Sequence, residues 1–154
     1  MKRLRLPAIA LVAACIASVL AGVPAGAAPA AGALQACDLL KRAEIADVLG
    51  EDAGRAEKLG VGDSSCFWEL AEADGGGLVL ALFRGREARS EYNRNERSYQ
   101  ESDLVTVDDL GRKAFVTPLG EIWVMKNKRT VFFITGVFDA SAAEELGRLA
   151  FDRL

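Results

Sequence analysis

Residues 121–135, EIWVMKNKRTVFFIT, carry the clearest β-hairpin signal in the chain. Both arms are rich in β-branched and aromatic residues, and the polar connection Asn127–Arg129 separates them. Two runs of this composition on either side of a short polar connection are typical of adjacent antiparallel strands. The sequence therefore predicts a β-hairpin near the end of the chain.

Runs of similar character upstream of the hairpin predict the rest of a sheet. Alternating or continuous apolar stretches indicate strands at residues 65–70, 78–83, 104–107 and 111–116, and a short strand ends at Leu59. Helices are expected from Asp38 or Lys41 to Leu49 with Gly50 as the stop signal, at residues 86–100, and after a capping box at Ser141–Glu144.

The order of these elements predicts the fold class. Strands that are grouped between helices, rather than alternating with them, favour the α+β class. We expect a single curved antiparallel sheet of about six or seven strands, with two or three helices on one face. Each half of the chain runs from a helix into a meander, which suggests an internal pseudo-repeat, although the residues themselves do not repeat.

The start of the chain has the pattern of an export signal. Lys2, Arg3 and Arg5 precede an apolar stretch at residues 6–23, and Ala25–Ala27 provides a small-residue cleavage site. We therefore expect residues 1–27 to be a signal peptide, 28–35 a disordered leader and 36–154 a single disulfide-stapled domain, secreted or periplasmic. Two alternatives stay open at this point: lipidation of Cys15, and an uncleaved N-terminal anchor.

Charge and composition exclude several function classes. Removal of residues 1–27 deletes three cations and no acid, which changes the formal net charge from −3 to −6. A negative chain lacks the basic footprint of a nucleic-acid-binding protein. The sequence contains no histidine, which excludes serine–histidine and cysteine–histidine nucleophiles and histidine-based zinc sites. We expect no catalytic residue, no metal site and no cofactor.

The two cysteines that follow the signal peptide, Cys37 and Cys66, predict a disulfide. An even count in a small exported domain favours pairing, and two cysteines allow only one pair. In the chain-entropy description a loop of this length stabilises the folded state by roughly 3–4 kcal/mol. A redox-active pair is the alternative, but the sequence has no Cys-x-x-Cys spacing to lower a thiol pKa.

Three short motifs lie along the expected domain: residues 36–50 (ACDLLKRAEIADVLG), residues 65–69 (SCFWE) and residues 110–115 (LGRKAF). With the closing amphipathic helix, they resemble a broad group of small bacterial secreted proteins and lipoproteins, best known in actinobacteria and largely of unknown function. The resemblance implies a fold and a disulfide, and supplies no catalytic residues. The chain departs from the group at Asp109–Arg112, where a glycine–leucine–glycine–aspartate turn is usual.

Three sets of side chains are candidates for recognition. An aromatic and basic strip and a basic hairpin tip are candidate binding surfaces, and two tryptophans are candidates for lining a groove. The strip contains Tyr92, Arg94, Arg97 and Tyr99, the tip contains Lys126, Lys128 and Arg129, and the tryptophans are Trp68 and Trp123. In each case the alternative is structural: a solvated helix or turn for the charged residues, and the core for the tryptophans.

Acidic residues offer a weaker signal. Asp38, Glu44 and Asp47 cluster near the first helix, and Asp108–Asp109 lie in an expected turn. Paired carboxylates catalyse glycoside hydrolysis when a cleft holds them at a set separation. A helix cap and a turn explain these acids more simply.

The sequence thus predicts a non-enzymatic exported domain that binds a protein or envelope component, with an inhibitor or immunity-type protein as a sharper version. The alternative function is a carrier for a small lipid or glycan. Nucleic acid is not an expected partner, and a membrane is expected only if Cys15 is lipidated.

Overall fold

A computed structural model describes residues 34–71, 76–137 and 139–154, which belong to one compact unit. The expected signal peptide, Cys15 and residues 28–33 of the expected leader lie outside the described residues. Across the described ranges, no helix is long and apolar enough to span a bilayer.

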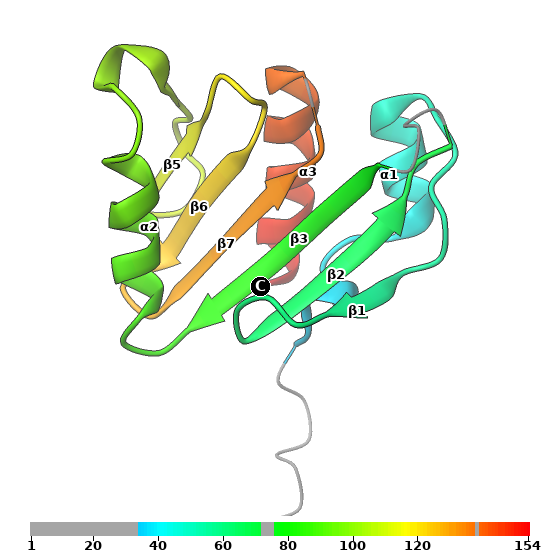
Figure 1. The fold of residues 1–154 in the computed structure, drawn as a ribbon, viewed down its shortest axis with the longest axis horizontal. Helices are drawn as coiled ribbons and strands as arrows, with labels where there is room; N and C mark the ends of the chain where they lie inside the picture. The colour runs from blue at the N-terminus through cyan, green and yellow to red at the C-terminus, as the bar shows by residue number, and fades with distance from the viewer. Residues whose placement is uncertain (1–33, 72–75, 138) are drawn as a thin grey trace, which may run out of the picture. The chain divides into compact units, whose positions relative to one another are not determined.

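The centre of the unit is one seven-stranded antiparallel sheet with the strand order β1-β2-β3-β7-β6-β5-β4 (Figure 1). The strands are β1 (Glu57–Leu59), β2 (Ser64–Glu69), β3 (Gly77–Arg84), β4 (Val105–Thr106), β5 (Lys113–Val116), β6 (Ile122–Asn127) and β7 (Thr130–Thr135). The α+β class and the single antiparallel sheet are confirmed. The sheet is open, so β1 and β4 are its two edges.

The predicted hairpin at residues 121–135 forms β6 and β7, with Val124 opposite Phe132. Strand β3 pairs with the other side of β7, which makes β3 an interior strand. The side chains of β3, β6 and β7 alternate between two apolar clusters, one on each face of the sheet. Burial on both faces explains why these three strands are nearly continuous apolar runs.

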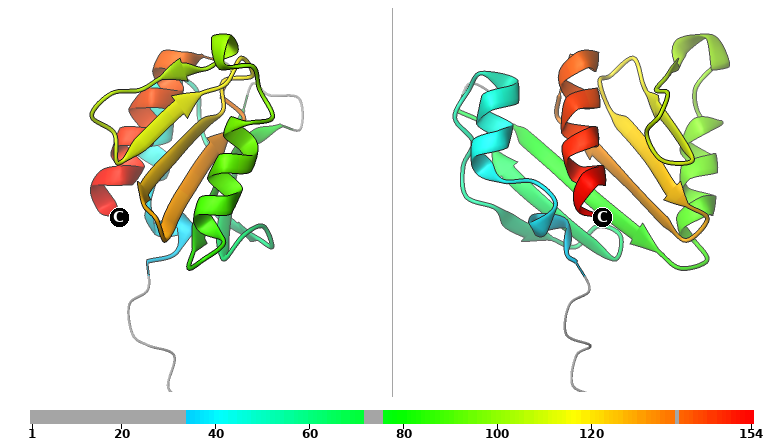
Figure 2. Two further views of the ribbon diagram at one scale, coloured as in Figure 1. Left: turned by 90° about the vertical axis from the view of Figure 1, so that its left-hand side faces the viewer. Right: turned by 180° about the vertical axis from the view of Figure 1, so that it is seen from behind.

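Three helices of two or more turns cover the sheet: α1 (Arg42–Leu49), α2 (Ala88–Glu96) and α3 (Ala140–Arg153). Helices α1 and α3 lie on one face, and α2 lies on the opposite face (Figures 1 and 2). The expectation that all helices share one face is therefore wrong. The two helix-and-meander halves also differ in which face their helix covers, so they are not arranged as two copies of one unit.

The main core lies between the sheet and helices α1 and α3. It includes Trp68, Leu80, Phe132 and Leu146, each at most 1% exposed. A smaller cluster beneath α2 contains Ala88, Tyr92, Phe115, Trp123, Met125 and Val131. Ala88 and Tyr92 are four residues apart, so they lie on the same face of α2 and attach an otherwise polar helix to the sheet.

The helix ends follow their sequence signals in one case and not in another. Gly50 terminates α1 in the left-handed conformation with φ 71°, as predicted. Helix α3 begins at Ala140, and its N-cap is Asp139, whose carboxylate accepts a hydrogen bond of 2.8 Å from the amide of Ala142. The expected capping box at Ser141 is wrong because Asp139 is the residue with extended backbone before the helix.

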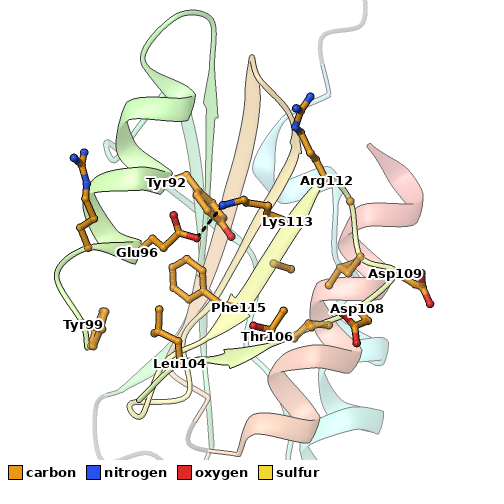
Figure 3. A pocket seen from close by; sticks show the side chains of 15 residues that line it. Tyr92, Glu96, Tyr99, Leu104, Thr106, Asp108, Asp109, Arg112, Lys113 and Phe115 are labelled. Carbon is orange, nitrogen blue, oxygen red and sulfur yellow. Dashed lines mark hydrogen bonds and ion pairs between the residues drawn. The ribbon is translucent and has the colours of Figure 1, made fainter. Parts of the chain in front are cut away.

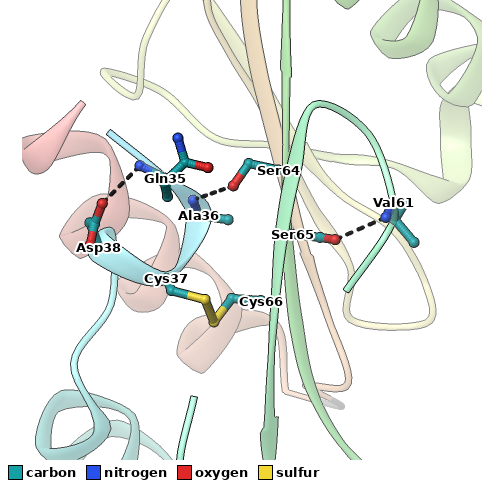
Figure 4. The surroundings of a disulfide bond; sticks show 8 residues. All are labelled: Gln35, Ala36, Cys37, Asp38, Val61, Ser64, Ser65 and Cys66. Atoms are coloured by element: carbon teal, nitrogen blue, oxygen red, sulfur yellow. Dashed lines mark hydrogen bonds between the residues drawn. A yellow bond between two sulfur atoms is a disulfide. The ribbon is translucent and has the colours of Figure 1, made fainter. Parts of the chain in front are cut away.

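The predicted Cys37–Cys66 disulfide is present, with an S–S distance of 2.06 Å (Figure 4). Cys37 lies in η1, a short 3-10 helix at Ala36–Asp38 that precedes α1, and Cys66 lies in β2. The amide of Ala36 also donates to the Ser64 hydroxyl at 2.8 Å. The disulfide therefore joins β2 to a separate N-terminal turn rather than to the first helix.

Contacts with the domain begin upstream of this turn. The carbonyl of Leu34 accepts a hydrogen bond from the Arg84 guanidinium. The amide of Gln35 donates to the Asp38 carboxylate at 2.9 Å. Leu34 and Gln35, expected to belong to the leader, already contact the folded unit.

Candidate functional site

A cavity of about 620 Å³ opens between α2 and the hairpin formed by β4 and β5 (Figure 3). Its walls come from the second half of α2, the connection from α2 to β4, and the turn from β4 to β5. The lining residues are Tyr92, Glu96, Arg97, Tyr99, Leu104, Thr106, Val107, Asp108, Asp109, Leu110, Gly111, Arg112, Lys113, Ala114 and Phe115. This volume lies within the usual range for ligand sites, roughly 300–1,000 Å³.

Two aromatic rings form the floor of the cavity. Tyr92 of α2 and Phe115 of β5 meet edge to face with their ring centroids 5.1 Å apart. Trp123 lies directly opposite Phe115 on the neighbouring strand β6, and its ring stacks on Phe133 at 4.5 Å. The aromatic floor therefore continues into the buried cluster beneath α2.

The hydroxyl of Tyr92 is the unusual group in this floor. The residue is only 1% exposed, and no hydrogen bond joins its hydroxyl to a described residue. The fully buried side-chain polar atom without a partner among the described residues is Nε1 of the neighbouring Trp123. Figure 3 shows the Tyr92 side chain among the residues that line the cavity. Burial raises the pKa of Tyr92 above its ordinary value, and the nearby Glu96 carboxylate adds to this effect. The group remains a neutral donor and acceptor in the lining of the cavity.

Charged side chains surround the aromatic floor. The Lys113 ammonium and the Glu96 carboxylate are 3.4 Å apart and partly exposed. Arg97 donates from its Nε atom to the carbonyl of Asn93 at 2.9 Å, so its side chain follows α2. Arg112 extends away from the cavity (Figure 3). Charges therefore lie on the rim, and rings lie on the floor.

The connection from α2 to β4 is fixed by Tyr99. Its hydroxyl lies 3.3 Å from the carboxylate of Glu121, at the start of β6. Burial and the Glu121 carboxylate both raise the pKa of the Tyr99 hydroxyl. The hydroxyl of Thr117 accepts from the amide of Glu121 at 3.2 Å, which orders the same turn.

The opposite end of the cavity is a tight turn between β4 and β5. Asp109 and Gly111 both have left-handed backbone, with φ values of 57° and 68°. A Cβ atom on Gly111 would lie 2.8 Å from the carbonyl oxygen of Met125, so only glycine fits there. The Arg148 guanidinium donates to the carbonyl of Asp108 at 3.1 Å. Asp108 and Asp109 are thus turn residues of the cavity wall.

The structure brings together part of the predicted aromatic and basic strip. Tyr92, Arg97 and Tyr99 line the cavity. Arg94 does not line it: its side chain is 68% exposed and pairs with Glu91. The four residues therefore do not form one strip.

The predicted basic hairpin tip is separate from the cavity. Lys126 lies over the Phe151 ring of α3 at 5.5 Å, while Lys128 and Arg129 are exposed at the tip. The carbonyl of Arg129 accepts from the amide of Gly85 at 2.9 Å, which places the tip beside the start of α2. The cavity lies at the other end of this helix, where Glu96 and Arg97 belong to its lining.

The two tryptophans do not line a common groove. Trp68 belongs to the main core and is 1% exposed, whereas Trp123 belongs to the cluster beneath α2 and is 4% exposed. The sheet separates them. Their alternating strand positions indicated burial, but not that they point to opposite faces.

Several cavity residues were not singled out from the sequence, namely Glu96, Leu104, Thr106, Lys113 and Phe115. One signal was available: Lys113 and Phe115 alternate on a strand, which places them on the same face. Nothing in the sequence placed that face beneath α2.

Comparison with known proteins identifies no relative. No protein-family model matches the chain, and no significant match was found among curated proteins or solved structures. Within the described ranges, no group of three or more cysteine, aspartate or glutamate side chains is arranged to hold a metal ion.

Proposed function

We propose that this protein is an exported, non-enzymatic binding domain that holds part of a protein or envelope component in the cavity between α2 and β5. The observation that carries the proposal is the cavity itself, which combines an aromatic floor with a charged rim. Tyrosine and arginine are enriched among residues that dominate protein interfaces. The disulfide is compatible with an oxidising compartment outside the cytoplasm.

The non-enzymatic part of the proposal rests on the chemistry of the side chains. The sequence contains no histidine. The ionisable groups that line the cavity are the partly exposed Lys113–Glu96 ion pair, two tyrosines with raised pKa values, two arginines, and two aspartates of the turn between β4 and β5. A tyrosine that resists ionisation is a poor general base at neutral pH. An inhibitor or immunity-type protein needs no active site, and such a role fits this surface.

Site-specific photo-crosslinking tests the proposal. A benzophenone amino acid replaces Arg97 at the cavity rim in one variant and Asp47, an exposed residue of α1, in a matched control. Both variants are exported as the full chain from cells that contain the whole envelope. We expect one defined crosslinked protein from the Arg97 position that is absent from the control. Identical adducts from the two positions would contradict the proposal.

A small-ligand carrier is the second candidate, and the cavity volume favours it. Trp68→Phe leaves Trp123 as the single tryptophan reporter. A lipid or glycan that enters the cavity should shift Trp123 emission, because Trp123 lies beside Phe115 on the neighbouring strand and faces the same side of the sheet. An unchanged emission spectrum with extracted envelope lipids and glycans would count against the carrier.

A further inference from the structure

The outer edge of the cavity is a sheet edge with unpaired backbone. Strand β4 is last in the strand order. The amide of Val107 donates to the carbonyl of Ala114 at 3.1 Å, and Val105 lies opposite Val116. In an antiparallel pair, alternate residues direct their amide and carbonyl groups to the partner strand. Those of Thr106, between the two, therefore point away from the sheet.

The two edges of the sheet differ in their side chains. Edge strand β1 consists of the exposed residues Glu57–Leu59 and carries one charge of each sign, and edge charges of this kind discourage pairing with another strand. Edge strand β4 carries no charge, and its Val105 side chain is 59% exposed. Of the two edge strands in the part of the chain that the structure describes, β4 is the one that presents a neutral edge to an incoming strand.

Acidic residues flank this neutral edge at both ends. Asp103 precedes β4, and Asp108 and Asp109 follow it, all with exposed side chains. The nearby cations have other partners or directions. Lys113 pairs with Glu96, Arg148 pairs with Glu144 and donates to the carbonyl rather than the carboxylate of Asp108, and Arg112 extends away from the cavity (Figure 3). A basic segment would find complementary charge at each end of β4.

The cavity lies beside this edge, on the α2 face of the sheet. Thr106 belongs both to the edge and to the cavity lining. Thr106 lies directly opposite Phe115. A long side chain from a strand added beside Thr106, on the α2 face, would extend over Thr106 into the cavity, toward Phe115 and Tyr92. The unpartnered hydroxyl of Tyr92 would then have a polar group to bind.

We infer that the partner contributes an extended basic segment that adds to the sheet beside β4, pairs with the backbone of Thr106, and places a side chain in the cavity. This inference rests on the proposed function and specifies its mode. Backbone pairing supplies affinity in this mode of recognition, and the pocket supplies specificity.

Selection from a phage-displayed library of random short peptides, against the oxidised exported chain, tests the inference. We expect the enriched peptides to combine alternating apolar residues with lysine or arginine at their ends. The double variant Asp103→Lys and Asp108→Lys should bind a synthetic peptide of an enriched sequence about tenfold more weakly. The same reversal at Asp47, far from β4 on α1, should not change its affinity.

Thr106 provides a test of backbone pairing. Thr106→Pro removes the outward amide without breaking the β4–β5 ladder, because this amide does not bond to β5. We expect it to weaken the peptide about tenfold, while Thr106→Ala, which keeps the amide, retains most of the affinity. A thermal unfolding curve for each variant verifies that it folds. Methylation of alternate backbone nitrogens in the peptide tests the same bonds from the other side.

The outcomes separate the two proposals. One outcome would overturn strand addition and leave cavity binding intact. In this outcome, substitution of Tyr99 abolishes peptide binding and the peptides compete with the Arg97 crosslink. Backbone methylation and Thr106→Pro, however, leave the affinity unchanged. If no substitution at the cavity or at the β4 edge changes peptide affinity, both the cavity proposal and strand addition are overturned. A selection that enriches no peptide, or that enriches acidic ones, also overturns strand addition.

Discussion

Arg153, in the last turn of α3, donates hydrogen bonds from both terminal nitrogens to the carboxylate of Glu44 in the first turn of α1, one of them at 2.8 Å. The Nη1 atom of Arg153 also donates to the carbonyl of Leu39 at 2.8 Å. This single side chain therefore joins α3, α1 and the segment after η1.

Replacement of Arg153 should reveal how much this junction contributes. We expect Arg153→Met to lower the free energy of unfolding by about 1–2 kcal/mol, because it removes two charge-assisted hydrogen bonds to Glu44 and one to the carbonyl of Leu39 in a half-buried site. Arg153→Lys should recover only part of the loss, since an ammonium cannot pair with both oxygens. A urea-denaturation double-mutant cycle with Glu44→Gln measures the coupling, and a coupling energy of zero would contradict this account.

The same pair predicts a contribution to acid sensitivity. The hydrogen bonds from Arg153 hold the pKa of the Glu44 carboxyl below its ordinary value of 4.5. A lowered folded-state pKa contributes stability that is present above the unfolded-state value and is lost as the pH falls through the folded-state value. We expect the free energy of unfolding of the wild-type chain to fall more steeply than that of the Glu44→Gln variant as the pH is lowered below about 5. Parallel pH dependences would show that Glu44 does not contribute.

Gly136 should tolerate no side chain. Its φ is 91°, and a Cβ atom would lie 2.1 Å from the carbonyl oxygen of Gly77, at the start of β3. Gly50 has a similar φ of 71° with open space around it and provides the matched control. We expect Gly136→Ala to cost at least about 3 kcal/mol and Gly50→Ala about 1 kcal/mol. Equal costs in denaturant melts would mean that the backbone contact with Gly77 can relax.

Tyr92 offers a test at alkaline pH. Its raised pKa means that the unfolded chain ionises this hydroxyl near pH 10 while the folded chain does not, so stability falls as the pH rises above that value. The free energy of unfolding should fall above this pH by up to about 1.4 kcal/mol per pH unit, and Tyr92→Phe should remove this dependence. At neutral pH it should change stability by less than about 1 kcal/mol, because the hydroxyl has no partner among the described residues. Tyr92→Ala should cost about 3–5 kcal/mol.

Reduction of the disulfide should destabilise the domain without redirecting the fold. Cys37 and Cys66 are 29 residues apart, and the chain-entropy model gives a loss of about 3–4 kcal/mol on reduction. Urea unfolding with and without a phosphine reductant measures the difference. A loss below about 1 kcal/mol would mean that η1 is held mainly by the Ala36–Ser64 hydrogen bond and its packing.

The sequence predicted a strand well where the residue types favour strands and a turn signal lies at the expected position between them. Ile122–Thr135 folds as the expected hairpin because both arms are rich in β-branched and aromatic residues and a short polar turn joins them. The side of the sheet that each helix covers was not predictable. Residues 78–83 are apolar on both faces, so the strand accepts a helix on either side, and the choice depends on connections such as Gly85–Glu87.

The candidate site was only partly predictable for a related reason. Tyr92 and Tyr99 stand out as aromatic residues in a polar stretch of sequence, and both line the cavity. The helix expected at residues 86–100 ends at Glu96, so Tyr92 lies in α2 and Tyr99 lies in the connection that follows it. Phe115 and Lys113 come from a strand that follows a tight turn. Their position beneath α2 is determined by tertiary packing, which local sequence patterns do not reveal. Arg94 lies in α2, three residues before the C-cap Arg97, and has the same chemistry, but it does not line the cavity. Composition alone does not distinguish the two.

The disulfide also has a mechanical consequence. Tension applied to the chain upstream of Cys37 passes through a covalent bond to Cys66, in the middle of β2. Strand β2 is held by register pairs to β1 on one side and β3 on the other. Force applied at that end is therefore transmitted through the disulfide to an interior strand, rather than being borne by η1 alone. Mechanical resistance at this end then depends on the pairing of β2 with its two neighbouring strands.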